Sequence, residues 1–135
     1  MSHTDNANLY TALKHAEFDP VVGIGLARLT GDTSLSVYAT EIAPGKQLKA
    51  HHHQQGVEVY LVIRGSGVMW MQGGADHNRD AAGTYRPLHK GDVLMVPAMT
   101  VHQLSNPGPD PLVMVFVCPP AHITTDRHLY TDTQQ

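Results

Sequence analysis

The stretch that decides the fold is GKQLKAHHHQQGVEVYLVIRG, residues 45–65. In an extended chain alternate side chains point to the same face, so His51 and His53 are expected to point together and His52 to the opposite side. Glu58 follows five residues after His53. A turn through the intervening Gln-Gln-Gly is therefore needed to bring its carboxylate back to the two imidazoles. Two imidazoles and one carboxylate make half of a first-row transition-metal site.

A second stretch, GDVLMVPAMTVHQLSN at residues 91–106, supplies a further histidine. On its own, His102 would be interpreted as a core or surface histidine rather than as a ligand. Its position between Pro97 and Asn106 changes that interpretation when the two stretches are considered together. We therefore predict that His102 completes the site begun by the first stretch.

Together the two stretches resemble the two motifs of the cupin superfamily, over roughly residues 34–118. The matching positions are Gly45, His51, His53, Glu58 and Gly65 in the first motif, and Gly91, Pro97, His102 and Asn106 in the second. The chain departs from the pattern at Met99, where the family usually has glycine two residues after the proline. This departure leaves the ligand set intact and affects the expected shape of the turn before His102.

The resemblance implies a jelly-roll, double-stranded β-helix barrel with each motif supplying one hairpin. It also implies one divalent transition metal ion (Fe, Mn, Ni, Zn or Cu) held by His51, His53, Glu58 and His102. Three neutral imidazoles and one carboxylate would leave a six-coordinate metal with two neighbouring positions for water, O2 or a substrate. Each ligand histidine also needs a partner for its other ring nitrogen, and the sequence does not identify it.

The rest of the chain has many short apolar runs separated by glycine and proline turns, with almost no helical period. This pattern is typical of an all-β sandwich or barrel. Within one domain spanning residues 1–135, we predict an N-terminal tail over 1–8, a barrel core over about 34–118, and a tail or short surface helix over 121–135. Apolar residues at helical spacing in 8–18 favour one short N-terminal helix, with an irregular surface arm as the alternative.

The composition restricts the class of protein. A chain of 135 residues is near the commonest size of one domain and can bury a core without disulfides. Cys118 is the only cysteine, which predicts a reducing compartment, the cytoplasm. No signal peptide is expected from the polar start, and no apolar run approaches the ~20 residues that cross a bilayer. A net charge of −3 and scattered basic residues argue against a nucleic-acid partner.

The register of the strand after Glu58 places Tyr60 and Val62 on the ligand side. Tyr60 is the candidate catalytic residue, as an acid or a substrate anchor; alternatively, its ring only packs in the core. A soft apolar pocket lining is suggested by Met69, Trp70, Met71, Met95, Met99 and Phe116. The other seven histidines are interpreted as surface or tail residues: His3, His15, His52, His77, His89, His122 and His128.

Three functions remain open, because one fold hosts many activities. The first is a metal-dependent oxidoreductase of dioxygenase type that acts on a small organic molecule. The second is a metal-dependent isomerase or epimerase of a sugar or keto acid. The third is a non-catalytic protein that binds a small metabolite, since no general acid–base pair is evident beside the motifs.

A homodimer is also expected. The strand VEVYLVI, residues 57–63, carries apolar Val57, Val59, Leu61 and Ile63 on the face opposite Glu58. A strand that is apolar on both faces must be covered on both faces. Either the N-terminal arm covers this outer face or a second subunit does, and small cupins are often dimers.

Overall fold

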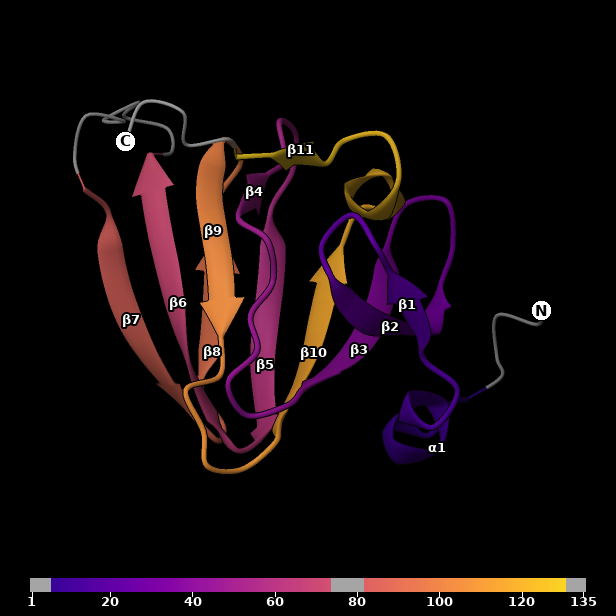
Figure 1. Ribbon diagram of the computed structural model, residues 1–135. Coiled ribbons are helices and arrows are strands. Elements are labelled where there is room, and N and C mark those ends of the chain that lie inside the picture. Colours follow the sequence, from indigo (N-terminus) through magenta and orange to yellow (C-terminus); the bar gives the residue numbers. More distant parts are fainter. Residues whose placement is uncertain (1–5, 74–81, 131–135) are drawn as a thin grey trace.

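The structure is a computed structural model that describes residues 6–73 and 82–130 (Figure 1). The elements in chain order are α1 (Leu9–Leu13), β1 (Glu17–Asp19), β2 (Ile24–Gly31), β3 (Ser36–Ile42), β4 (His51–His52), β5 (Glu58–Arg64), β6 (Ser66–Gly73), β7 (Thr84–His89), β8 (Val93–Val96), β9 (Thr100–Ser105), β10 (Leu112–Cys118), a 3₁₀ turn η1 (Pro120–Ile123) and β11 (His128–Leu129). The expected short N-terminal helix is present, and Asn8 caps it by accepting hydrogen bonds from the amides of Tyr10 and Thr11.

The strands form two antiparallel sheets that face each other without closing (Figure 1). The six-stranded sheet has the order β1-β2-β3-β10-β5-β8, and the five-stranded sheet has the order β11-β4-β9-β6-β7. Consecutive strands such as β5 and β6, or β8 and β9, belong to different sheets, so the chain winds between the two layers. This arrangement confirms the predicted all-β, double-stranded β-helix jelly roll.

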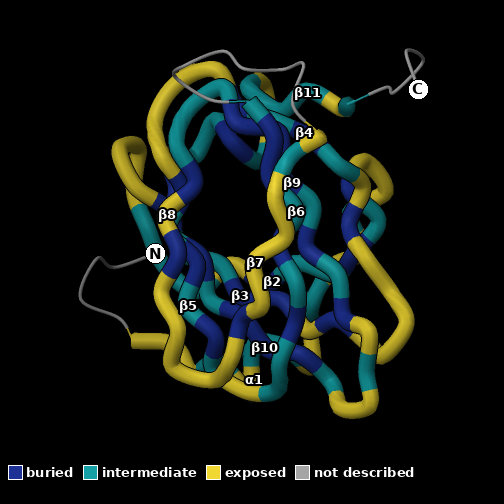
Figure 2. The backbone as a smooth tube through the Cα atoms, turned by 90° about the vertical axis from the view of Figure 1, so that its left-hand side faces the viewer, coloured by how far each residue is buried: buried dark blue, intermediate teal, exposed yellow. Residues whose placement is uncertain are grey.

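The core lies between the sheets, and β5 shows how the sequence pattern produces it. Glu58, Tyr60 and Val62 are buried, whereas Val59 and Leu61 on the opposite face are partly exposed. Burial therefore alternates along the strand as predicted. Figure 2 shows the buried segments along the strands and most of the exposed ones at the turns. Other large buried side chains of this core are Ile42, Met69, Leu104, Leu112, Met114 and Phe116.

Two turns of the motifs depend on left-handed backbone. Gly65 has φ of 79°, and a Cβ at this position would lie 2.2 Å from the carbonyl oxygen of Pro111, so only glycine fits. Met99, where the cupin pattern has glycine, has φ of 67°. Its amide donates a 2.7 Å hydrogen bond to the carbonyl oxygen of His53. The turn before His102 is therefore left-handed even though a methionine occupies it.

The C-terminal part departs from the sequence interpretation. Residues 121–130 were expected to be a tail or a surface helix, but they contain part of η1 and the strand β11, which pairs with β4. In Figure 1 these elements lie together at one end of the molecule, away from α1. Residues 131–135 lie outside the described part of the chain. We refer to Pro119–Tyr130 as the C-terminal segment.

The predicted soft apolar lining is confirmed at Phe116, whereas none of the methionines named for it lines the cavity at the metal ligands. Met95 is 54% exposed, because it lies on the outer face of β8, opposite the buried Leu94 and Val96, whereas Met69 is fully buried in the core. Residues 74–81, between β6 and β7, lie outside the described part of the chain. Among the described residues, no helix is long and apolar enough to cross a membrane.

Candidate metal centre

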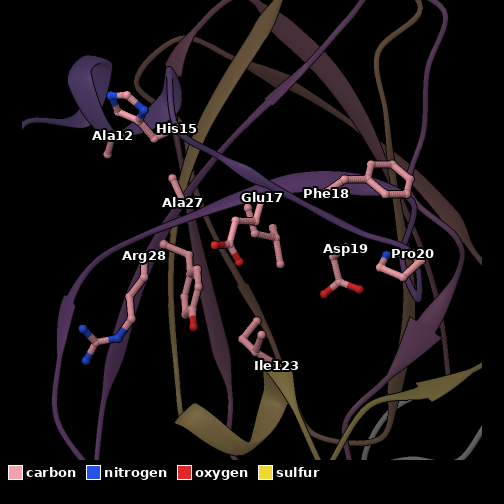
Figure 3. Close-up of a pocket in the computed structure, with 11 residues that line it drawn as sticks. Ala12, His15, Glu17, Phe18, Asp19, Pro20, Ala27, Arg28 and Ile123 are labelled. Carbon is pink, nitrogen blue, oxygen red and sulfur yellow. The ribbon is translucent and has the colours of Figure 1, made fainter.

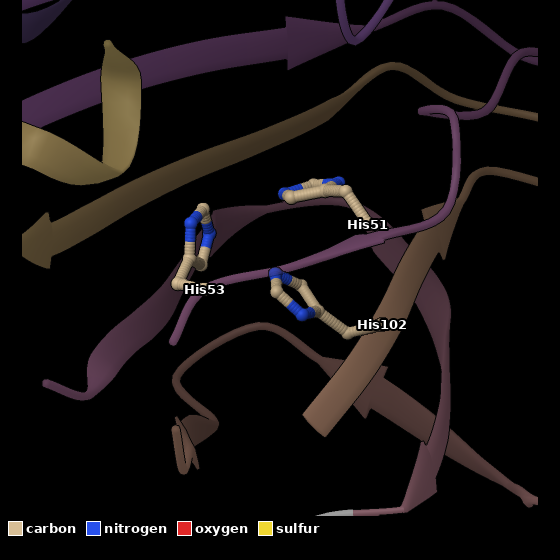
Figure 4. A group of neighbouring side chains, drawn as sticks. All are labelled: His51, His53 and His102. Carbon is tan, nitrogen blue, oxygen red and sulfur yellow. The ribbon is translucent and has the colours of Figure 1, made fainter. Parts of the chain in front are cut away.

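Three histidines from two strands converge at one end of the barrel (Figure 4). His51 on β4 is the register partner of His102 on β9, and His53 follows just after β4. The ring centroids are 4.4 Å apart for His51 and His102, 5.0 Å for His51 and His53, and 5.3 Å for His53 and His102. One potential ligand nitrogen from each ring lies within 4.8 Å of the others. The strand pairing thus brings together the histidines of the two sequence motifs.

Backbone carbonyls orient all three rings. The Nδ1 atom of His51 lies 2.8 Å from the carbonyl oxygen of Lys49, and that of His102 lies 3.0 Å from the carbonyl oxygen of Thr100. The Nδ1 atom of His53 lies 2.6 Å from the carbonyl oxygen of Asp126. A carbonyl oxygen only accepts hydrogen bonds, so each Nδ1 carries a proton and each ring turns its Nε2 atom toward the cluster. These carbonyls are the partners that the sequence could not identify.

The Nε2 lone pairs of the histidines are suited to bind a cation. Among the described residues, the Nε2 atoms of His53 and His102 are buried and have no partner with hydrogen-bond geometry. A buried polar atom without a partner is costly, and a metal ion would satisfy it. Burial, reinforced by the neighbouring His102, lowers the pKa of His51 to about 3, so this ring is neutral near neutral pH. Three imidazole nitrogens within 4.8 Å of one another are a suitable donor set for a first-row divalent ion.

The Glu58 carboxylate lies beside the same histidines. The chain bends at residues 54–56, where Gly56 has φ of 81°, and returns with Glu58 at the start of β5. Glu58 Oε2 lies 3.0 Å from His53 Nε2, and Oε1 lies 3.7 Å from His102 Nε2. The structure therefore brings all four predicted ligands together, as two overlapping groups that share His53: the three histidines, and Glu58 with His53 and His122.

Tyr60 holds the Glu58 carboxylate. Its side chain is buried on the ligand side of β5, as its register predicts, and its hydroxyl donates a 2.6 Å hydrogen bond to Glu58 Oε1. Burial and the adjacent carboxylate raise the pKa of Tyr60 well above its usual value. The ring also stacks on Phe116, at 5.5 Å between centroids. Tyr60 thus both packs in the core and makes a polar contact with the site.

His122 was predicted to be a surface or tail residue, and this prediction is wrong. Its ring, on η1, is 1% exposed and stacks on His53 at 3.9 Å between centroids with 4° between planes. Its Nδ1 lies 3.0 Å from Glu58 Oε2, and its Nε2 lies 2.6 Å from the carbonyl oxygen of Gln55. Both partners are acceptors, so both ring nitrogens donate and the ring is a cation. No spacing in the two motifs marks this histidine, because its partner Glu58 is 64 residues away in sequence.

The charges of Glu58 and His122 stabilise each other. Burial alone would raise the pKa of Glu58, but contacts with His102, His122 and His53 outweigh it and hold that pKa well below its usual value. Burial would likewise lower the pKa of His122, but the bonds to Glu58 and to the Gln55 carbonyl outweigh it and raise that pKa. The carboxylate is therefore ionised, as a metal ligand must be.

The C-terminal segment closes this end of the barrel. The Asp126 side chain accepts hydrogen bonds from the amides of Gln54 and Gln55, at 2.7 and 2.9 Å, while its carbonyl holds His53. The ring of His52 stacks on His128 at 5.1 Å rather than joining the cluster, as strand alternation predicts. His51, His53, Glu58 and His102 are each at most 4% exposed, and the cavity that the site residues line has a volume of only about 20 Å³.

Comparisons with known proteins agree with this architecture. The family model described as "Cupin domain" matches residues 38–118. No match is found among curated proteins. A Klebsiella pneumoniae protein with a double-stranded β-helix domain superposes with a TM-score of 0.69 at 19% identity, over 98% of this chain and 100% of that one.

Two further solved structures resemble the chain. One is described as a predicted oxalate decarboxylase of Thermotoga maritima, with 18% identity and a TM-score of 0.67 over 84% of this chain and 96% of that one. The other is the capsular polysaccharide assembling protein CapF of Staphylococcus aureus, with 18% identity and a TM-score of 0.68 over 84% of this chain and 31% of the longer CapF chain. At these identities the likeness concerns the fold alone.

Proposed function

This chain belongs to the cupin family, and on that premise we propose that it is a metal-dependent enzyme that binds one divalent first-row transition metal ion. His51, His53 and His102 would hold the ion through Nε2, with Glu58 as the fourth ligand. The observation that carries this proposal is the convergence of three imidazoles whose Nδ1 atoms are all bonded to carbonyl oxygens. That pattern leaves the Nε2 atom of each ring available to a metal ion in a buried site.

The reaction class that we favour is that of a dioxygenase-type oxidoreductase acting on a small organic molecule. When bound, the metal would supply redox chemistry. The chain itself supplies an enclosed site: Leu48, Leu104 and Phe116 line the cavity beside the ligands and exclude bulk water. Tyr60 and His122 fix the orientation of the Glu58 carboxylate from opposite oxygens.

Oxygen consumption tests this proposal. Metal-stripped protein would be reconstituted with Fe(II), Mn(II), Ni(II), Cu(II) or Zn(II), and O2 uptake followed with a panel of enediols, catechols and small keto acids. We expect uptake with one redox-active metal and one substrate class, and none with the double variant His51→Ala, His102→Ala. Equal metal content in that variant and the wild type would refute the ligand assignment. Metal binding without turnover of any substrate would favour the non-catalytic binding function.

An isomerase or epimerase is the second candidate, and one observation favours it. Tyr60, Glu58 and His122 form a continuous hydrogen-bonded row beside the metal ligands, with the His122 ring protonated. This row pairs the Glu58 carboxylate with an acid, His122, which the sequence analysis did not identify. Exchange of substrate hydrogen with deuterium from solvent under anaerobic conditions distinguishes the two candidates, because a dioxygenase requires O2 and an isomerase does not.

We also propose that the protein is a homodimer, in the cytoplasm, with the outer face of β5 and β8 as the interface. Val93 and Met95 on β8 are 66% and 54% exposed, and they flank Leu61 and Val59 of β5 through direct register pairing. A contiguous apolar patch of this kind is typical of an interaction site. The buried free thiol of Cys118 agrees with a reducing compartment.

A further inference from the structure

A second cavity opens beside the metal site, between α1, β1 and the adjoining strands β2 and β3 (Figure 3). It has a volume of about 570 Å³, and we call it the N-terminal groove. Its lining is mixed: Phe18 and Pro20 are apolar, whereas Glu17, Asp19 and Arg28 are charged. Clefts of roughly 300–1,000 Å³ are the size that binds small organic molecules. The cavity at the metal ligands, at about 20 Å³, has room for about one water molecule.

The groove and the metal cavity share a wall. Leu26 and Ile123 line both of them. An ion pair joins the two spaces as well, because Asp19 lines the groove, Arg127 lines the metal cavity, and Arg127 Nη1 donates to Asp19 Oδ2. The wall between the groove and the metal cavity therefore includes two apolar side chains and one salt bridge.

Arg127 provides the second observation. Its side chain is 8% exposed, and its Nε atom is buried without a hydrogen-bond partner among the described residues. A buried guanidinium N–H without an acceptor is costly, whereas guanidinium groups bind carboxylates strongly and directionally. Asp19 neutralises the charge of Arg127. In the metal cavity, the two positive charges of a divalent ion would exceed the single negative charge of Glu58. The metal cavity therefore attracts an anion and has a free donor to receive it.

We propose that the N-terminal groove and the metal cavity are the outer and inner halves of one ligand site, and that the ligand is a small organic carboxylate whose anionic group binds Arg127 Nε beside the metal. The apolar part of the ligand rests against Phe18 and Pro20 in the groove, and Leu26 and Ile123 move apart to let the carboxylate through. Glu17 and Arg28 offset each other in charge, so selection for an anion comes from the metal ion and from the Nε donor of Arg127. This inference rests on the proposed metal site and names its substrate class.

Ligand binding to the cobalt-loaded full chain tests the inference, with benzoate as the probe and benzamide as its neutral counterpart. We expect benzoate to change the visible absorption of the bound Co(II) and to bind about tenfold or more tightly than benzamide. Arg127→Gln should raise the benzoate Kd about tenfold or more at unchanged cobalt content. Arg28→Gln, which removes the same charge from the outer wall, should change it by less than about threefold.

Two further variants separate recognition from folding. Asp19→Asn breaks the same ion pair but keeps the guanidinium, so benzoate should bind as well as to the wild type, or better. Equal losses in Asp19→Asn and Arg127→Gln would assign Arg127 a structural role only and overturn the inference. Leu26→Phe, which narrows the shared wall, should slow benzoate binding and leave that of azide unchanged; an unchanged benzoate rate would exclude the groove as the route.

The outcomes also separate this inference from the proposed metal function. A wild type that binds no cobalt refutes the metal site. A wild type that binds cobalt, but takes benzoate no better than benzamide, refutes only the carboxylate assignment. Calorimetric titration of benzoate into the metal-free wild type and the metal-free Arg127→Gln variant measures the contribution of Arg127 whether or not cobalt binds. Loss of the guanidinium should weaken benzoate binding in the metal-free protein as well.

Discussion

Replacing His51 by glutamine should remove a specific acid sensitivity of the metal-free protein. The buried His51 ring has a pKa of about 3, compared with 6.5 for an unperturbed histidine. Between these two values the unfolded chain binds a proton at this ring and the folded chain does not. The free energy of unfolding therefore falls as the pH falls through this window. Glutamine does not titrate, and its amide can still donate a hydrogen bond to the carbonyl of Lys49.

The size of the effect follows from the two pKa values. Near pH 8 both states hold His51 neutral, and the ring contributes no pH dependence. At about pH 5 the unfolded state gains roughly 2 kcal/mol from protonating this ring, because each pKa unit corresponds to about 1.4 kcal/mol. Wild type should therefore lose about 2 kcal/mol more stability than His51→Gln between these two conditions.

Urea unfolding of chelator-treated protein at the two pH values measures this difference, with circular dichroism as the probe. All other titrating groups are common to both proteins, so their contributions cancel to the extent that the substitution leaves them undisturbed. If the two proteins lose equal stability on acidification, His51 is not held neutral by burial. The argument that the site is preorganised for a metal would then lose its electrostatic support.

Four other predictions concern the site, the turn and the interface. His53→Ala should reduce the metal content measured by elemental analysis and His52→Ala should not; equal losses would mean that the strand register is shifted by one residue. Asp126→Ala should weaken metal binding about tenfold in a chelator competition, because Asp126 positions the carbonyl behind His53, and unchanged affinity would refute that role. Met99→Gly should leave the free energy of unfolding unchanged or raise it by up to about 1 kcal/mol. Met99→Val should lower it by more than that, since a β-branched residue tolerates positive φ poorly. The reverse order of the two variants in thermal melts would contradict this. Val59→Asp should convert a dimer to a folded monomer in sedimentation equilibrium, and a wild-type mass near 14.7 kDa at every concentration would exclude the dimer.

Most strands, and the choice of side chains on β5 that face the site, could be predicted from the sequence because they depend on local periodicity. The alternation along VEVYLVI placed Glu58, Tyr60 and Val62 on one side, and the structure buries these three side chains. The same rule separated His52 from the cluster. Local pattern failed at Met95, because the sequence does not state which face of β8 packs on the core, and in the described part of the chain Met95 lies on the exposed face.

The sequence by itself predicted the fold and the histidine cluster through the resemblance of its two motifs to those of cupins, and it predicted the facing of side chains within each motif because alternation acts over a few residues. The tertiary structure alone decided what surrounds that cluster. His122 meets Glu58 across 64 residues of sequence, Asp126 meets His53 across 73, and Arg127 meets Asp19 across 108. Contacts at such separations depend on where the C-terminal segment packs after the two sheets have formed. No local period encodes that position, since it results from the burial and hydrogen bonding of the whole barrel end.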